Sequence, residues 1–502
     1  MSTVNEPGQG DILMQDLQTR DPSKLTEEIS HTLEDDGRCC YKLKNGLLDR
    51  SKCVFTVTYI IFSFTLGLAN GVAAHSFADL IHIADTTVRK GLLFYTMDIV
   101  GYLLGTLLMG YLFDKPLLDR NLLMFLAIVG YCVIVAIIPW CGMYEIMFTL
   151  FTVKGAFRGG LLTCGTAGLV TTWGTDGNSY LFASDFTVAL GSSVSSSVVS
   201  PFALSHDVQI PIRNYTDTVN CIDNIYATIE NNGSCNNVHK RSPTGTHSGD
   251  RSSMIYIPFT ITTGLCFMTS LPFIVLCCIS LSNKTIREFR KENEGNNRKQ
   301  DRRLQIWGLI NIIIYIAVYG VLFTSYQFFL PIFIAVHMNR RMFSSLFTSG
   351  FRLSFSFGNF FGIFLVKCVS PAKMLLIFNS VLLTALLGFI LTSLFDVIYG
   401  ALVFTMIVTF SLSVTFPVLI MWINQNFFRV NGKVISVFLF TEMVSVFATS
   451  FIAFDSHWFI YLLCGKAVFL FLLYLTGVYI SRKTASRQSI IQDEDLTSPV
   501  WG

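Results

Sequence analysis

The sequence predicts an all-α integral membrane protein of the kind that has twelve transmembrane helices in two six-helix halves. Hydrophobic residues make up 52% of the 502-residue chain and charged residues 14%, with a mean hydropathy of +0.54. A soluble domain would carry roughly 25% charged residues. Six long apolar runs precede a basic segment at 284–303, and six follow it. Because about 20 apolar residues cross the hydrocarbon core of a bilayer, we interpret each run as a membrane span.

The predicted spans divide the chain into two tails, two halves and a linker. The expected spans are 53–73, 91–112, 121–141, 146–173, 179–204, 254–281, 305–335, 344–366, 373–395, 397–422, 433–455 and 458–480. The corresponding regions are an N-terminal tail at 1–52, a first half at 53–281, a basic cytoplasmic linker at 282–304, a second half at 305–481 and a C-terminal tail at 482–502. Both tails are polar, and we expect them to be disordered.

Basic residues near the span ends predict the orientation. They gather before the first span and after the last, which places both termini in the cytoplasm. The long loop at 205–253 then lies outside. It holds two glycosylation sequons, at Asn214 and Asn232, and two cysteines, Cys221 and Cys235, that would form a disulfide in an oxidising compartment. We therefore predict a glycoprotein of the secretory pathway, with the plasma membrane as its destination.

The turn between the second and third spans carries a recognisable motif. It reads Gly110-Tyr-Leu-Phe-Asp114-Lys115 and is followed by Asp119-Arg120. This resembles the Gly-x-x-x-Asp-Arg/Lys signature of the major facilitator superfamily. In that family a small residue permits close helix approach, and the acid pairs with basic side chains across the cytoplasmic gate. The alternative is an ordinary charged turn, but the twelve-span plan favours the family.

Further segments resemble one branch of that superfamily, the sodium-dependent glucose transporter type. They are 173–174, 186–191, 200–202, 345–351 and 432–438. The resemblance implies transport of glucose or a related small solute, with sodium coupling. Sugar-transporting members tend to have an acid and an amide on the fourth span just before Trp-Gly. Here 162–167 reads Leu-Thr-Cys-Gly-Thr-Ala, which has neither group.

Charged residues inside predicted spans are the first candidates for a functional site, since each costs about 2.5–3.5 kcal/mol on insertion scales. Arg158 is a candidate for binding substrate. Candidates for coupling or gating are Asp98, Asp185, Arg352 and Glu442, together with the motif residues Gly110, Asp114, Lys115 and Arg120. The alternative is that the intramembrane charges form structural ion pairs. Arg158 lies four residues after Lys154, so the two share one helix face.

Uncharged polar residues supply the second group of candidates, all assigned to substrate binding. They are Tyr315, Tyr319, Tyr326, Gln327, Asn70 and Asn311. Aromatic faces beside amide and hydroxyl groups suit a sugar ring, which has apolar faces and a polar rim. The alternative is that the tyrosines lie at the membrane interface, where this residue is common.

These observations favour a secondary active or facilitative transporter of a small polar solute. The first candidate for the solute is glucose or a related sugar, and the candidate coupling ion is sodium or a proton. One alternative is a proton-coupled transporter of an organic anion, whose carboxylate Arg158 and Arg352 would hold. The other is a receptor or scaffold that does not transport. The sequence has no phosphate-binding loop, Cys/His metal cluster or basic aromatic patch, so we expect no enzyme activity, cofactor, metal or nucleic-acid partner. The expected partners are the solute and the lipid bilayer, and we expect the monomer to be functional.

Overall fold

The computed structural model describes residues 50–115, 119–174, 177–202, 254–282, 302–336, 341–428, 430–449 and 459–497. The predicted sequons at Asn214 and Asn232 and the predicted disulfide between Cys221 and Cys235 lie outside these residues. Most of the N-terminal tail and of the basic linker lies outside them too.

The described residues are almost entirely helical. The first half contains the helix Arg50–His75, α3 (Phe77–Ile83), α4 (Val88–Phe113), α5 (Arg120–Ile137), η1 (Ile138–Trp140), α6 (Tyr144–Trp173), α7 (Asn178–Val199) and α9 (Tyr256–Ser282). The second half contains α11 (Arg302–Val336), α12 (Arg341–Cys368), α13 (Pro371–Leu394), α14 (Ile398–Asn426), α15 (Gly432–Thr449) and α16 (Phe459–Thr497). Twelve of these helices correspond to the twelve predicted spans.

The structure differs from the prediction in two places. The short helix α3 occupies part of the link between the first two spans, where no helix was predicted. In the C-terminal tail, α16 continues to Thr497, so the prediction of disorder is wrong for residues 482–497. That segment has few apolar residues but no Gly or Pro, and it extends a helix that is already formed, so no new nucleation is needed.

Nine of the described helices are long and apolar enough to cross a membrane by themselves. The three long helices outside this set are α6, α7 and α12, which are richer in polar and small residues. These three helices also pack against helices of the opposite half, α6 against α15 and α7 against α12. Polar spans therefore lie between the halves, where lipid does not surround them.

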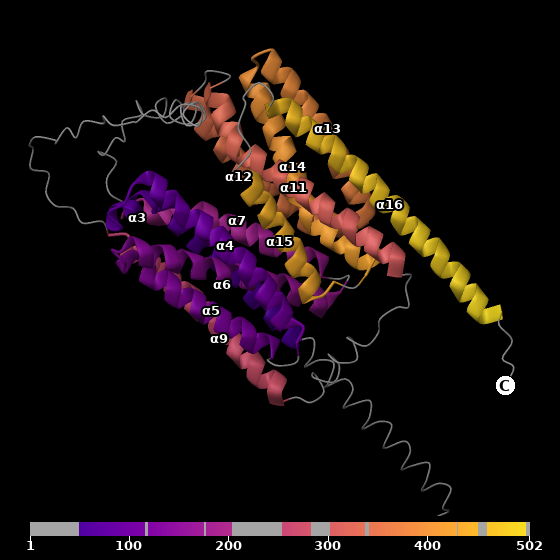
Figure 1. Ribbon diagram of the computed structural model, residues 1–502, viewed down its shortest axis with the longest axis horizontal. Helices are drawn as coiled ribbons and strands as arrows, with labels where there is room; N and C mark the ends of the chain where they lie inside the picture. Colours follow the sequence, from indigo (N-terminus) through magenta and orange to yellow (C-terminus); the bar gives the residue numbers. More distant parts are fainter. Residues whose placement is uncertain are drawn as a thin grey trace, which may run out of the picture.

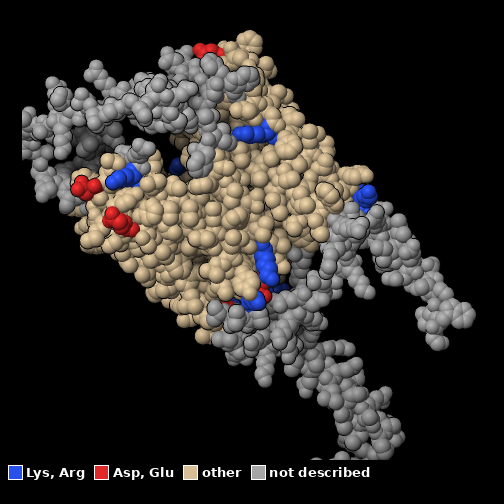
Figure 2. Space-filling view, viewed as in Figure 1, with Lys and Arg blue, Asp and Glu red and all other residues tan. Residues whose placement is uncertain are grey.

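The two halves meet mainly along two pairs of helices, α4 with α15 and α7 with α12. Figure 1 shows the first half in indigo and magenta and the second in orange and yellow, drawing together where α4 ends and α15 begins and diverging toward α3. We call the end of the bundle where α4 ends and α15 begins the closed end. On the face shown in Figure 2, charged side chains lie toward the two ends, and the broad band between them is uncharged. Such a band matches the hydrocarbon layer of a bilayer.

Candidate functional site

Three charged side chains join α4 to α6 inside the first half. Asp98 Oδ2 lies 2.9 Å from Arg158 Nη2, and Asp98 Oδ1 lies 3.3 Å from Lys154 Nζ. The side chains of Asp98 and Lys154 are 5% and 3% exposed, whereas that of Arg158 is 19% exposed. Because one carboxylate faces two cations, the cluster carries a net positive charge, and Arg158 is its most accessible member.

Glycines on both helices explain why these charges meet. A Cβ at Gly101 or Gly105 of α4 would overlap the backbone of α6, and a Cβ at Gly155 or Gly159 of α6 would overlap the backbone of α4. The two backbones are therefore in direct contact, as small-residue faces allow in membrane helices. Gly155 itself packs against the backbone of Asp98, which places this carboxylate beside the cations of α6.

Aromatic rings cover both cations of the cluster. Lys154 Nζ lies 4.7 Å from the ring centroid of Phe151, and the guanidinium carbon of Arg158 lies 5.1 Å from that of Tyr102. Cation–π contacts of this kind are worth about 2 kcal/mol when desolvated. Arg158 Nε is buried and donates to no acceptor within the described parts of the chain. The ring and Asp98 thus orient the Arg158 guanidinium without using all of its donors.

Two further carboxylates come from opposite halves, Asp185 from α7 and Glu442 from α15. Both side chains are half-buried, and neither carboxylate has a hydrogen bond or ion pair with any described residue. They are close enough to interact electrostatically, and both also act on the buried hydroxyl of Tyr102. Glu442 packs beside α11, where a Cβ at Gly320 would lie 3.2 Å from the Glu442 carbonyl oxygen. Two such carboxylates within electrostatic range of each other can hold a proton or a cation.

The tyrosines of α11 form part of an aromatic wall in the second half. The ring of Tyr319 stacks on those of Phe323 and Phe416, with centroids 6.2 and 6.1 Å apart. The three tyrosine hydroxyls already have partners: Tyr315 bonds to Asn379 at 3.1 Å, Tyr319 donates to the Leu412 carbonyl at 3.0 Å, and Tyr326 bonds to Thr405 at 3.0 Å. The structure therefore uses these hydroxyls to join α11 to α13 and α14. The side chains of all three tyrosines are buried, so the prediction that they bind solute is not supported by their surroundings.

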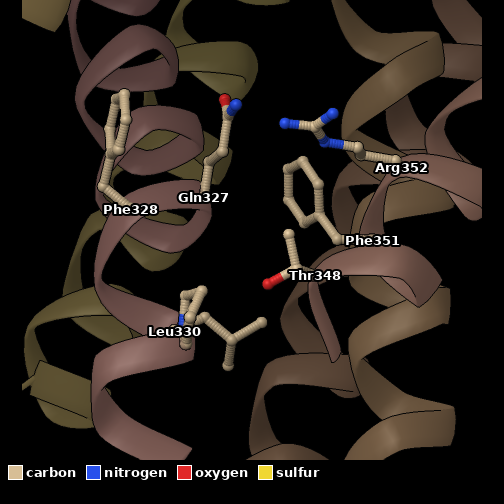
Figure 3. A pocket seen from close by; sticks show the side chains of 7 residues that line it. Gln327, Phe328, Leu330, Thr348, Phe351 and Arg352 are labelled. Carbon is tan, nitrogen blue, oxygen red and sulfur yellow. The ribbon is translucent and has the colours of Figure 1, made fainter. Parts of the chain in front are cut away.

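Gln327 and Arg352 lie on either side of a pocket between α11 and α12. In Figure 3 their polar groups point toward one another across it, with the ring of Phe351 beside them. Thr348 and the apolar side chains of Phe328, Leu330 and Pro331 complete the lining. The structure therefore brings together two residues that the sequence placed in separate groups of candidates.

At the closed end, the motif carboxylate bridges the two halves. Asp114 Oδ1 accepts from the Gly432 N–H and Oδ2 from the Lys433 N–H, each at 2.9 Å. These amides belong to the first turn of α15, so a residue of the first half caps a helix of the second. Among the described residues the partners of this carboxylate are thus backbone N–H groups, and not the basic side chains that the motif led us to expect. Gly110 packs against Ser436 so closely that a Cβ would overlap it. The Gly-x-x-x-Asp motif thus provides both a close approach and a charge at the start of α15.

The two basic residues of the motif cover aromatic rings at the same end. Lys115 Nζ lies 5.0 Å from the ring centroid of Tyr111, and the Arg120 guanidinium carbon lies 4.6 Å from that of Phe113. Lys433 of the opposite half also lies over Tyr111, at 6.0 Å. The first half thus contributes ring faces, and both halves contribute cations.

A second contact between the halves joins α7 to α12. The Ser179 hydroxyl donates to the Ile363 carbonyl at 3.3 Å, and the rings of Phe186 and Phe360 lie 5.4 Å apart. Gly362 packs directly on the ring of Phe182. These contacts involve the first turns of α7, so they too lie near the closed end.

Each of the two predicted asparagines joins two helices by a side-chain hydrogen bond. Asn70 accepts a bond from the Tyr131 hydroxyl at 3.3 Å, which joins the first helix to α5. Asn311 donates to the Thr476 hydroxyl at 2.7 Å, which joins α11 to α16. The Asn70 bond lies within the first half and the Asn311 bond within the second, so neither bond joins the two halves.

Sequence reasoning did not assign Lys154 or Tyr102 to the site. Lys154 had an available signal, since it lies one helical turn before Arg158 and carries a charge within a predicted span. The sequence contains no comparable signal for Tyr102, because the contact of this ring with Arg158 depends on the angle at which α4 meets α6.

Comparison with solved structures identifies the fold. Similar structures include FucP, a fucose:proton symporter of E. coli, in the outward conformation, with a TM-score of 0.59, 13% identity and coverage of 85% of this chain and 99% of that one. The proton:xylose symporter XylE has a TM-score of 0.54, 11% identity and coverage of 86% and 95%. A bacterial homologue of the iron transporter ferroportin, in an outward-facing state, has a TM-score of 0.56, 10% identity and coverage of 85% and 99%.

Sequence comparison identifies fewer relatives than the comparison of structures. No family model matches the chain. A sodium-dependent glucose transporter 1 from Xenopus laevis is 26% identical over 127 residues, which is 25% of this chain and about a quarter (26%) of that relative's length. The three structures each match 85% or 86% of this chain, and so most of its helical bundle. The chain therefore has the fold of the major facilitator superfamily.

Proposed function

We propose that this protein is a secondary transporter that moves a small polar solute across a membrane by alternating access. The observation that carries the proposal is the pair Asp185 and Glu442, two carboxylates without partners among the described residues and within electrostatic range of each other across the two halves. A scaffold protein would gain nothing from these charges, each of which is costly at membrane depth. A transporter uses such groups to bind solute or a coupling ion near the interface between its repeats.

Contacts between the halves at one end support the same proposal. Asp114 and Ser179 both make their bonds near the closed end. We assign that end to the cytoplasm, since basic residues flank it and both named outward structures share the fold. Opening would then require Asp114 to release α15 while new contacts form at the other end.

A sugar is the first candidate for the solute. Two structures with this fold are named for fucose and xylose, and the curated relative is named for glucose and sodium. The half-buried ring of Phe416, which stacks on the buried ring of Tyr319, offers a flat apolar surface that a sugar ring can cover. We propose sodium or a proton, bound at Asp185 and Glu442, as the coupling ion. We propose the plasma membrane as the location of the protein, with glycans attached to Asn214 and Asn232.

Uptake in cells that express the protein tests this proposal. Radiolabelled glucose uptake is measured with sodium, with sodium replaced, and across a pH gradient, after surface expression has been confirmed. We expect uptake that depends on one of the two ions and is lost in Glu442→Gln. The matched control is Glu145→Gln, which neutralises an exposed carboxylate at the start of α6. Glucose is excluded as the solute if the surface-expressed protein transports none under any condition.

A further inference from the structure

The pocket at Arg352 contains a charge that its own surroundings do not balance. Arg352 is exposed into the pocket, and its guanidinium has no hydrogen bond or ion pair with a described residue. It follows the first residue of α12, Arg341, by eleven positions, or about 16 Å along the helix axis. That depth is near the middle of a hydrocarbon core about 30 Å thick. A cation there needs either water or an anion.

The two helices that line the pocket, and their neighbours α13 and α14, supply no counter-charge; α15, which also packs against α11, carries Glu442. α11, α12, α13 and α14 contain no Asp or Glu at all. On α7, the helix from the opposite half, the acid is Asp185, and the adjacent Phe186 contacts Phe360 of α12. Arg352 lies eight residues from Phe360, about 12 Å farther from the closed end. Asp185 is therefore at a different level of the bundle.

The chemistry of the pocket indicates what it would bind. A guanidinium binds a carboxylate through two parallel hydrogen bonds, and the Gln327 amide opposite can donate a further one. Phe351 and Phe328 line the pocket with apolar surface for the rest of a small molecule. One cation in the lining matches one negative charge on the ligand.

We propose that Arg352 and Gln327 form a binding site for the carboxylate of a small organic anion. The inference rests on the proposed function and adds acids, such as sugar acids, to the neutral sugars as a class of solute. Arg352 would hold the carboxylate, and the rings of α11 and α12 would contact the body of the solute.

Binding to the purified full-length protein in detergent tests the site without requiring transport. The probes are two matched pairs, glucuronate with glucose and benzoate with benzyl alcohol, each an acid and a neutral counterpart. The readout is the apparent melting temperature as a function of probe concentration. We expect at least one acid to stabilise the protein where its neutral counterpart does not. In Arg352→Gln we expect the half-saturating concentration of that acid to rise about tenfold or more, while Arg482→Gln, which removes an exposed cation of α16, behaves like the parent.

A second measurement does not depend on the choice of acid. Since Arg352 has no partner in the described structure, the unliganded Arg352→Gln protein should melt at or above the temperature of the parent. A marked decrease would mean that the guanidinium has a structural role, and would overturn the proposal. So would the absence of stabilisation by either acid, or equal stabilisation of the parent and Arg352→Gln. If the parent protein binds neither acid but takes up glucose, this site is rejected and the transporter assignment stands. If the parent protein binds an acid but transports no solute, the site stands and the transporter assignment is rejected.

Discussion

Removing the Asp114 carboxylate should loosen the closed end by a predictable amount. In the structure this half-buried side chain accepts two backbone N–H groups of α15, at Gly432 and Lys433. Replacing an N-cap residue by Ala costs about 0.5–2 kcal/mol. Here the cost falls only on conformations in which the halves touch, because the donor and acceptor belong to different halves. Asp114→Ala should therefore raise the ratio of open to closed conformations at this end by about 5–30-fold for a loss of 1–2 kcal/mol.

The rate at which a maleimide labels a cysteine at position 436 would measure this change. Ser436 is 4% exposed and packs against Gly110, so a cysteine there reacts only when the halves separate. The same protein without the added cysteine gives the background. Asp119→Ala is the matched control, because Asp119 caps α5 within its own half by accepting from Asn121 N–H at 2.9 Å. If Asp114→Ala and Asp119→Ala label at the same rate, the cap on α15 does not hold the closed end.

Three further changes separate structural from functional roles. Asp98→Asn leaves two adjacent cations without their carboxylate, so we expect a stability loss of about 3–5 kcal/mol, measured as a lower melting temperature. Adding Lys154→Met should recover part of this loss. An unchanged melting temperature in Asp98→Asn would contradict the ion cluster. Gly105→Val should prevent α4 from packing on α6 and abolish the monodisperse protein peak, while Gly264→Val on α9, where a Cβ meets nothing within 4 Å, should be tolerated. Tyr326→Phe removes a hydroxyl bonded to α14, so it should cost about 1 kcal/mol of stability and leave uptake unchanged; lost uptake in a stable protein would mean that the hydroxyl contacts solute.

The sequence predicted the fold well because membrane spans depend on local composition. Twelve apolar runs were enough to predict twelve helices. The Gly110–Asp114 motif indicated a contact at the end of α4, but Asp114 meets backbone N–H groups there and not the basic side chains that were expected. The C-terminal tail was mispredicted because polar composition does not distinguish a disordered tail from an extension of an existing helix.

The candidate site was harder to predict because its geometry depends on helix packing. Sequence could identify Arg158 and Asp98 as costly charges, but their pairing follows from the glycines that bring α4 and α6 into backbone contact. The α11 tyrosines looked like solute ligands, yet whether a hydroxyl is available depends on side chains of α13 and α14 distant in sequence. The pocket joining Gln327 to Arg352 likewise depends on how α11 and α12 face each other.

The length of α16 has a practical consequence for imaging. The helix has 39 residues, or about 58 Å at 1.5 Å per residue, and its candidate span ends at Lys483. The following 14 residues to Thr497 would project about 21 Å farther as a rod, and Figure 1 shows this end of α16 extending beyond its neighbours. A small rigid protein fused in continuous helical register after Thr497 would stand clear of the detergent micelle. It would give single-particle images of this otherwise featureless molecule a fixed marker for alignment.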